Sequence, residues 1–143
     1  MNSERSRYPI QCDPQGDPDF EITFYKSIID KDPTYVDALT LLGEAYSRKG
    51  LYEEGLKIDQ HIATLRPLDP IAFYNLACSY SLVHMKKEAL KNLRKSIVLG
   101  YNDLEHIAGD RDLYSLHADR SFHKLMRRLC KKILIGIQKR HAD

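Results

Sequence analysis

One pattern occurs twice between residues 36 and 101, and it limits this chain to a small set of folds. Each copy has an apolar residue, a leucine, a small residue and a tyrosine at equivalent positions: Leu39, Leu42, Gly43 and Tyr46, then Phe73, Leu76, Ala77 and Tyr80. Each residue of the first copy is separated from its equivalent in the second copy by the same number of residues. The spacing i, i+3, i+4, i+7 places the side chains on one face of a helix. A repeat of this kind predicts a stack of similar helical units, each of which packs on its neighbours.

This pattern, closed by Pro67 in the first copy, resembles the tetratricopeptide repeat (TPR), a helix-turn-helix unit of the same period. The resemblance implies an all-α fold, a short TPR helical-hairpin solenoid with a flanking N-terminal helix and C-terminal capping helices. Helices are expected at about 36–49 and 52–65 in the first repeat and at about 70–83 and 86–99 in the second. Gly55 and Asp59 depart from the family pattern, which usually has alanine and an aromatic residue there.

A length of 143 residues fits one domain. We expect a flexible N-terminal arm over 1–17 and a single TPR domain over 18–143, divided into a half repeat at 18–33, repeats at 36–69 and 70–103, and capping helices at 104–143. Asp17 and Pro18 form a helix-start signal, because Asp accepts from free backbone N–H groups and Pro fits the first turn. This first helix should run to about Asp30.

After residue 103 the repeat pattern stops, and short helices followed by one long helix are predicted. The spacing of Asp110, Leu113, Leu116, Asp119, Phe122 and Leu125 resembles a segment that often closes TPR arrays in bacterial proteins. In the final helix one apolar stripe is expected to face the array: Phe122, Leu125, Met126, Leu129, Ile133 and Ile137. Leu134 and Ile135 fall outside it, and they are candidates for contact with a second chain, which leaves a homodimer open, or with the N-terminal arm.

Charge is unevenly distributed along the chain, although its net value is only +2. Residues 1–33, 34–118 and 119–143 carry −3, −1 and +6, so the final helix is a basic element on a nearly neutral body. Three widely spaced cysteines do not form a disulfide framework, which favours reduced thiols and a cytoplasmic location. No apolar run resembles a signal peptide or is long enough to span a bilayer.

The sequence contains no catalytic signature. Phosphate-binding glycine loops, zinc-binding His-Glu-x-x-His and the nucleophile elbow are all lacking in the sequence. The six histidines do not share a spacing that would bring three or four metal ligands together. We therefore expect neither an enzyme nor a protein with a metal or cofactor.

Because the sequence has no catalytic or metal-binding signature, we expect the protein to act through a binding surface. The TPR resemblance implies a concave groove lined by the first helix of each repeat. The groove residues expected from it are Thr40, Glu44, Arg48, Ile71, Tyr74, Asn75, Cys78 and Leu82. Asn75 matches an asparagine that bonds the backbone of an extended ligand in the family, and apolar ligand side chains would lie on Tyr74 and Leu82. The predicted function is a protein–protein interaction scaffold whose partner is another protein or a peptide.

Three other functions compete with this one. The clamp with which TPR co-chaperones hold acidic tails of heat-shock proteins is disfavoured, because Thr40 and Glu44 stand where Lys and Asn would be expected. Attachment of the basic C-terminal helix to nucleic acid or an anionic membrane is the main alternative. Nucleic acid is the less favoured partner, since the helix has a single aromatic residue, on its buried stripe. A TPR-type secretion chaperone is a further alternative.

Overall fold

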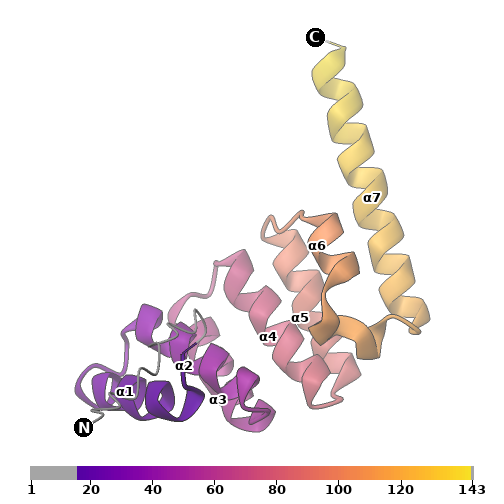
Figure 1. The fold of residues 1–143 in the computed structure, drawn as a ribbon. Helices are drawn as coiled ribbons and strands as arrows, with labels where there is room; N and C mark the ends of the chain where they lie inside the picture. Colours follow the sequence, from indigo (N-terminus) through magenta and orange to yellow (C-terminus); the bar gives the residue numbers. More distant parts are fainter. Residues whose placement is uncertain (1–15, 143) are drawn as a thin grey trace, which may run out of the picture.

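The computed structural model describes residues 16–142, so residues 1–15 of the predicted arm lie outside the described residues. The described part is built of α-helices and one 3₁₀-helix, without a strand: α1 Pro18–Lys31, α2 Val36–Arg48, α3 Tyr52–Leu65, α4 Pro70–Leu82, α5 Lys86–Val98, α6 Leu104–Gly109, η1 Arg111–Leu116 and α7 Arg120–His141. Consecutive helices pack as hairpins that stack into a short solenoid (Figure 1). The predicted all-α fold class, with flanking N-terminal and capping helices, is confirmed.

Local sequence signals explain where several helices begin. The Asp17 carboxylate accepts a hydrogen bond from the Asp19 backbone N–H at 3.0 Å, and Pro18 occupies the first turn of α1. Asp69 and Pro70 repeat this arrangement at α4, where the carboxylate accepts from the Ile71 N–H at 2.9 Å. Each aspartate satisfies a backbone donor that lacks a partner within its helix.

The turns inside the two repeat hairpins need a left-handed backbone. Gly50 follows α2 with φ +79°, and His84, at the equivalent position of the second repeat, follows α4 with φ +62°. Glycine adopts this conformation without cost, whereas a residue with a Cβ atom is strained there. The second hairpin therefore has the same geometry as the first, but it is closed by a less suitable residue.

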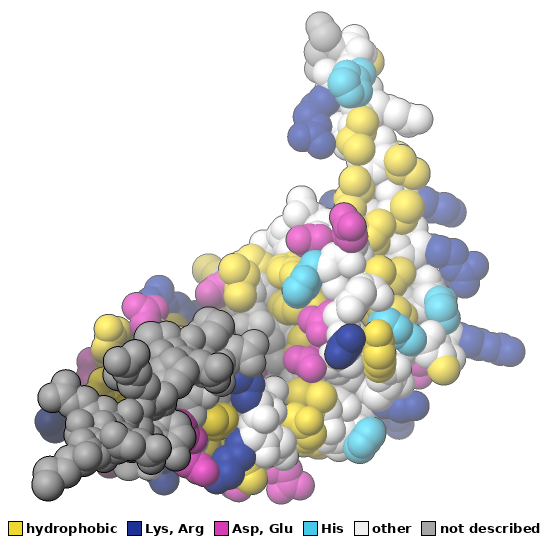
Figure 2. All heavy atoms as spheres, in the orientation of Figure 1, with side chains coloured by type: hydrophobic (Ala, Val, Ile, Leu, Met, Phe, Trp, Pro, Cys, Tyr) yellow, Lys and Arg dark blue, Asp and Glu magenta, His cyan; other side chains and the backbone are white. Residues whose placement is uncertain are grey.

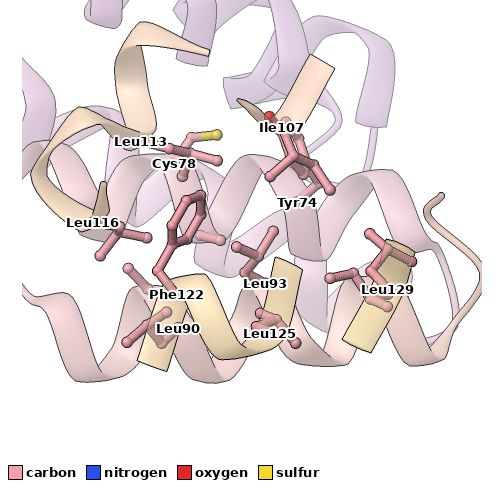
Figure 3. Close-up of a cluster of buried hydrophobic side chains, with 13 residues drawn as sticks. Tyr74, Cys78, Leu90, Leu93, Ile107, Leu113, Leu116, Phe122, Leu125 and Leu129 are labelled. Carbon is pink, nitrogen blue, oxygen red and sulfur yellow. The ribbon is translucent and has the colours of Figure 1, made fainter. Parts of the chain in front are cut away.

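The largest hydrophobic cluster joins the second repeat to the capping segment, which we define as α6, η1 and α7. Leu93 of α5 meets Ile107, Leu113 and Leu116, and all four side chains are 0% exposed (Figure 3). The α7 residues Phe122, Leu125 and Leu129 close the same cluster from the other side. The capping segment thus covers α4 and α5, as a repeat stack requires at a terminal unit.

Helix α7 continues beyond the body that it caps (Figure 1). Met126 and Ile133 are half-buried against the cluster, whereas Ile137 is 40% exposed and lies outside it. The prediction that the apolar stripe faces the array as far as Ile137 is therefore wrong. The periodicity of the stripe is correct, but at Ile137 α7 has run past the helices on which it packs. Leu134 and Ile135 are also exposed.

Candidate binding groove

A cavity of about 180 Å³, here called the groove, opens between α2, α3, α4 and the capping segment. Its lining contains Thr40, Gly43, Glu44, Ser47, Tyr52, Gly55, Asp59, Tyr74, Asn75, Cys78, Ser79, Leu82, His106, Asp110 and Asp112. Gly43 of α2 and Gly55 of α3 face each other, and a Cβ atom on Gly55 would lie at an ordinary contact distance of 3.7 Å from the Gly43 carbonyl oxygen. The groove is thus bounded by both repeats and by the cap.

The structure brings six of the eight predicted groove residues together around this cavity: Thr40, Glu44, Tyr74, Asn75, Cys78 and Leu82. The other two lie elsewhere. Arg48 forms an ion pair with Glu21 of α1, and Ile71 is 58% exposed at the start of α4, away from the groove lining.

Tyr74 forms part of the wall of the groove and offers little apolar surface. Its side chain is 3% exposed, its ring stacks on Tyr101 with 4.3 Å between centroids, and its hydroxyl donates to Asp110 Oδ2 at 2.6 Å. Burial, together with the hydrogen bond to Asp110, raises the pKa of Tyr74 above its ordinary value. The expected apolar contact of a ligand with the Tyr74 ring does not fit this geometry, because the capping segment and Tyr101 cover the ring.

Cys78 is likewise buried, one turn further along α4, with Sγ at 3.7 Å from Asp110 Oδ2. Burial, and then the negative charge of Asp110, raises the pKa of the Cys78 thiol. A thiol held protonated in this way is a poor nucleophile, because the thiolate is the reactive form. Cys78 therefore serves packing.

Carboxylates dominate the groove. Asp59 of α3 accepts a hydrogen bond from the Ser79 hydroxyl, and burial raises the pKa of Asp59 to about 6, against the lowering effect of Ser79, with a smaller contribution from Glu44. Burial, and then the neighbouring Asp110, also raises the pKa of Asp112. Four acidic side chains thus line the groove with His106, and its lining contains neither Lys nor Arg.

Sequence reasoning missed the acidic residues contributed by α3 and the cap. Asp59 had one usable signal, since a carboxylate stood where the family usually has an aromatic residue. Asp110 was expected only as part of the segment that closes the array, and its Oδ1 accepts from the Asp112 N–H at 2.9 Å, which caps η1. Its second oxygen, which binds Tyr74, points back to the second repeat. No local sequence pattern predicts this contact, because the two residues are 36 positions apart in the chain.

Two kinds of arrangement are not found among residues 16–142. No group of three or more His, Cys, Asp or Glu side chains there is arranged to hold a metal ion. No helix in that range has the length and apolar content needed to cross a membrane.

The fold and the groove define a class of protein, a helical repeat array with a binding cleft on one face. A family model described as the tetratricopeptide repeat matches residues 24–57, from the middle of α1 through α2 into α3. Residues 24–57 thus match a tetratricopeptide repeat, and the described residues form a helical repeat array, so the resemblance found in the sequence is confirmed. The matched unit begins at residue 24, which is 12 residues before residue 36, so it takes the second half of α1 into the array.

One curated relative is a protein of Arabidopsis thaliana whose name describes it as chloroplastic, and it is 31% identical to this chain over 88 residues. The match covers 59% of this chain and 26% of the relative. The chain therefore spans about a quarter of the length of that relative.

Proposed function

We propose that this chain is a non-catalytic adaptor that holds an extended segment of another protein in the groove. Tetratricopeptide repeats generally mediate protein–protein interaction. The observation that carries the proposal is the cleft itself, where residues from both repeats and the cap surround one cavity. Asn75, half-buried in its wall, has an amide that can pair with both the N–H and the C=O of an extended backbone.

The charge of the groove suggests the kind of segment that it accepts. Glu44 is exposed at the cavity, and Asp59 and Asp112 lie deeper, with carboxyl pKa values raised by burial. A Lys or Arg side chain placed among them would offset this cost, whereas an acidic segment would add to it. We therefore propose a partner segment that carries basic residues, and the acidic tails held by heat-shock co-chaperones remain disfavoured.

Fluorescence anisotropy with a library of labelled peptides tests this function. Basic peptides should bind, and matched peptides with Glu in place of Lys should not. Asn75→Ala should weaken binding by about tenfold, because one or two backbone hydrogen bonds of about 1 kcal/mol are lost. Glu44→Gln should weaken it by roughly two- to fivefold, as expected for an exposed ion pair.

Glu53→Gln is the matched control, since Glu53 is an exposed acid on α3 outside the groove lining. It should leave peptide binding unchanged. If binding peptides respond equally to Glu44→Gln and Glu53→Gln and ignore Asn75→Ala, they bind elsewhere on the surface and the groove proposal fails.

The two alternatives from the sequence have less support. Helix α7 carries eight basic and no acidic side chains, which suits attachment to nucleic acid or an anionic membrane. Its exposed leucine and isoleucine side chains would suit the membrane but add nothing to phosphate contacts with nucleic acid, and neither attachment uses the groove. A secretion chaperone rests on the family resemblance alone. The cytoplasmic location also stays a proposal, drawn from the reduced thiols, and the Arabidopsis relative is named as chloroplastic.

A further inference from the structure

The two terminal helices of the array each present an apolar outer face. On α1 no side chain is fully buried, and Phe20 and Phe24 are 68% and 49% exposed. Their rings stack on each other with centroids 6.1 Å apart, which makes one continuous apolar surface. On the other side α1 packs on α2, and Ile29 reaches the cluster around Leu39. We call the surface of Phe20 and Phe24 the α1 face.

Helix α7 has a comparable strip. Cys130, Leu134 and Ile137 are spaced i, i+4 and i+7, so they share one side of the helix, and Leu134 and Ile137 are 54% and 40% exposed. Towards the body this strip, here called the α7 strip, runs into a largely apolar hollow of about 420 Å³ between α6 and α7, lined in part by Leu104 and Met126. Figure 2 shows hydrophobic side chains along the projecting part of α7 with Lys and Arg beside them.

Ile135 does not belong to this strip. Successive residues of a helix are about 100° apart, so Ile135 points away from Leu134 and into the basic side of α7, between Lys131 and Lys139. The two residues expected to share an oligomer contact therefore face different directions. This difference makes Ile135, which is 52% exposed, a matched control for Leu134.

The charges of the two ends are opposite. Residues 16–33 contain five acidic and two basic side chains, whereas α7 contains eight basic side chains and no acidic one. Arg48 at the end of α2 and Lys49, which follows it, pair with Glu21 and Asp19 of α1. These pairs neutralise two of the five acidic side chains, so the α1 end is weakly acidic, with Asp30 exposed at the far end of α1. Because the ends lie on opposite sides of the molecule, they cannot meet within one copy (Figure 1).

We propose that this chain associates head to tail with a second copy of itself, with the α1 face of one molecule on the α7 strip of the next. Interior helices of a repeat stack are covered on both sides, and terminal helices of a soluble stack usually have a polar outer face. Here both outer faces are apolar, and the strongly basic α7 would meet a weakly acidic α1 end rather than a second basic surface. Pairing of two α7 helices is disfavoured, since it would bring eight like charges on each helix together.

Such a contact is heterologous, because each copy uses a different surface. This gives a test with two complementary variants of the full chain, measured by light scattering coupled to size exclusion. Phe20→Gln/Phe24→Gln removes the α1 face, and Leu134→Gln/Ile137→Gln removes the α7 strip. The wild-type mass should rise above that of a single chain as concentration increases from the micromolar to the millimolar range. Each variant alone should remain a monomer.

The equimolar mixture of the two variants decides the matter. It keeps one intact α7 strip and one intact α1 face, so it should form a dimer with twice the mass of the single chain that grows no further. Ile135→Gln should associate like the wild type, and added salt should weaken association. Circular dichroism melts that match the wild type show that the variants are folded.

Three results would overturn the proposal. A wild-type chain that stays monomeric throughout the concentration range shows that the two faces do not associate. Self-association of Phe20→Gln/Phe24→Gln shows that α7 helices pair with each other, or that another surface is used. Two monomers in the mixture show that the complementary faces do not bind, whatever each variant does alone.

Discussion

The buried carboxylate of Asp59 should make this protein more stable in mild acid than at neutral pH. In the folded state burial raises the pKa of Asp59 from 3.8 to about 6. Between these pH values the folded chain binds more protons than the unfolded chain, so the free energy of unfolding falls as pH rises. The contribution is fully present below pH 3.8 and is lost as pH rises through about 6.

Replacing Asp59 with Asn isolates this effect. A pKa difference of about two units corresponds to about 3 kcal/mol, and partial access of water to the half-buried side chain reduces this to about 2–3 kcal/mol. Asn is uncharged, and its side-chain oxygen can still accept the hydrogen bond from Ser79. The free energy of unfolding of Asp59→Asn should therefore exceed that of the wild type by about 2–3 kcal/mol at neutral pH and by little in acid.

Urea unfolding followed by circular dichroism, at about pH 4.5 and pH 7.5, measures both quantities. Glu53→Gln on the same helix is the control, since Glu53 is exposed and its replacement should leave the pH dependence unchanged. A smaller slope of the same sign should remain in Asp59→Asn, because the pKa of Asp112 is also raised. If Asp59→Asn keeps the full wild-type slope, or is less stable at neutral pH, the reasoning about this carboxylate is refuted.

Three further predictions concern the fold. His84→Gly should raise the free energy of unfolding by about 1 kcal/mol, because it relieves a left-handed backbone, whereas Gly50→Ala should lower it by a similar amount; a loss in both cases would contradict the turn geometry. Leu93→Ala should lower the free energy of unfolding, measured in urea, by about 2–5 kcal/mol, since the Leu93 side chain is 0% exposed. A decrease below about 1 kcal/mol would disagree with the observed core. Tyr74→Phe should cost about 1–3 kcal/mol and speed proteolysis of the cap, because Asp110 loses a hydrogen-bond donor; equal proteolysis rates would count against this link.

The helices were predictable because their signals are local. Asp17, Asp110 and Asp119 cap the helices that follow them, and each does so through a backbone N–H two residues away. The expected boundaries of the repeat helices agree with the structure within a residue or so, because apolar periodicity and the stops at Gly50 and Gly100 lie within the segment itself. Tyr46 shares the periodicity of Leu39 and Leu42 but is only half-buried, since exposure depends on neighbouring helices.

The groove was predictable only in part. Thr40 and Glu44 followed from the repeat pattern, because the family resemblance implies which side of α2 faces a ligand. Arg48 lies outside the cavity lining, and its ion pair with Glu21 depends on how α1 lies against α2. The four-carboxylate character of the cavity was not foreseen, because its members belong to different helices and no periodicity connects them.

The repeat period, the helices with their caps and turns, and the opposite charges of the two ends could all be read from the amino-acid sequence. These are properties of single segments, set by hydrogen bonds and side-chain spacing within a few residues. Only the packing of the helices shows that Asp59 and Asp110 line one cavity and that the cap covers Tyr74. It also shows that at Ile137 α7 extends past the helices on which it packs. Each of these depends on the distance and angle between packed helices, which no local sequence signal specifies.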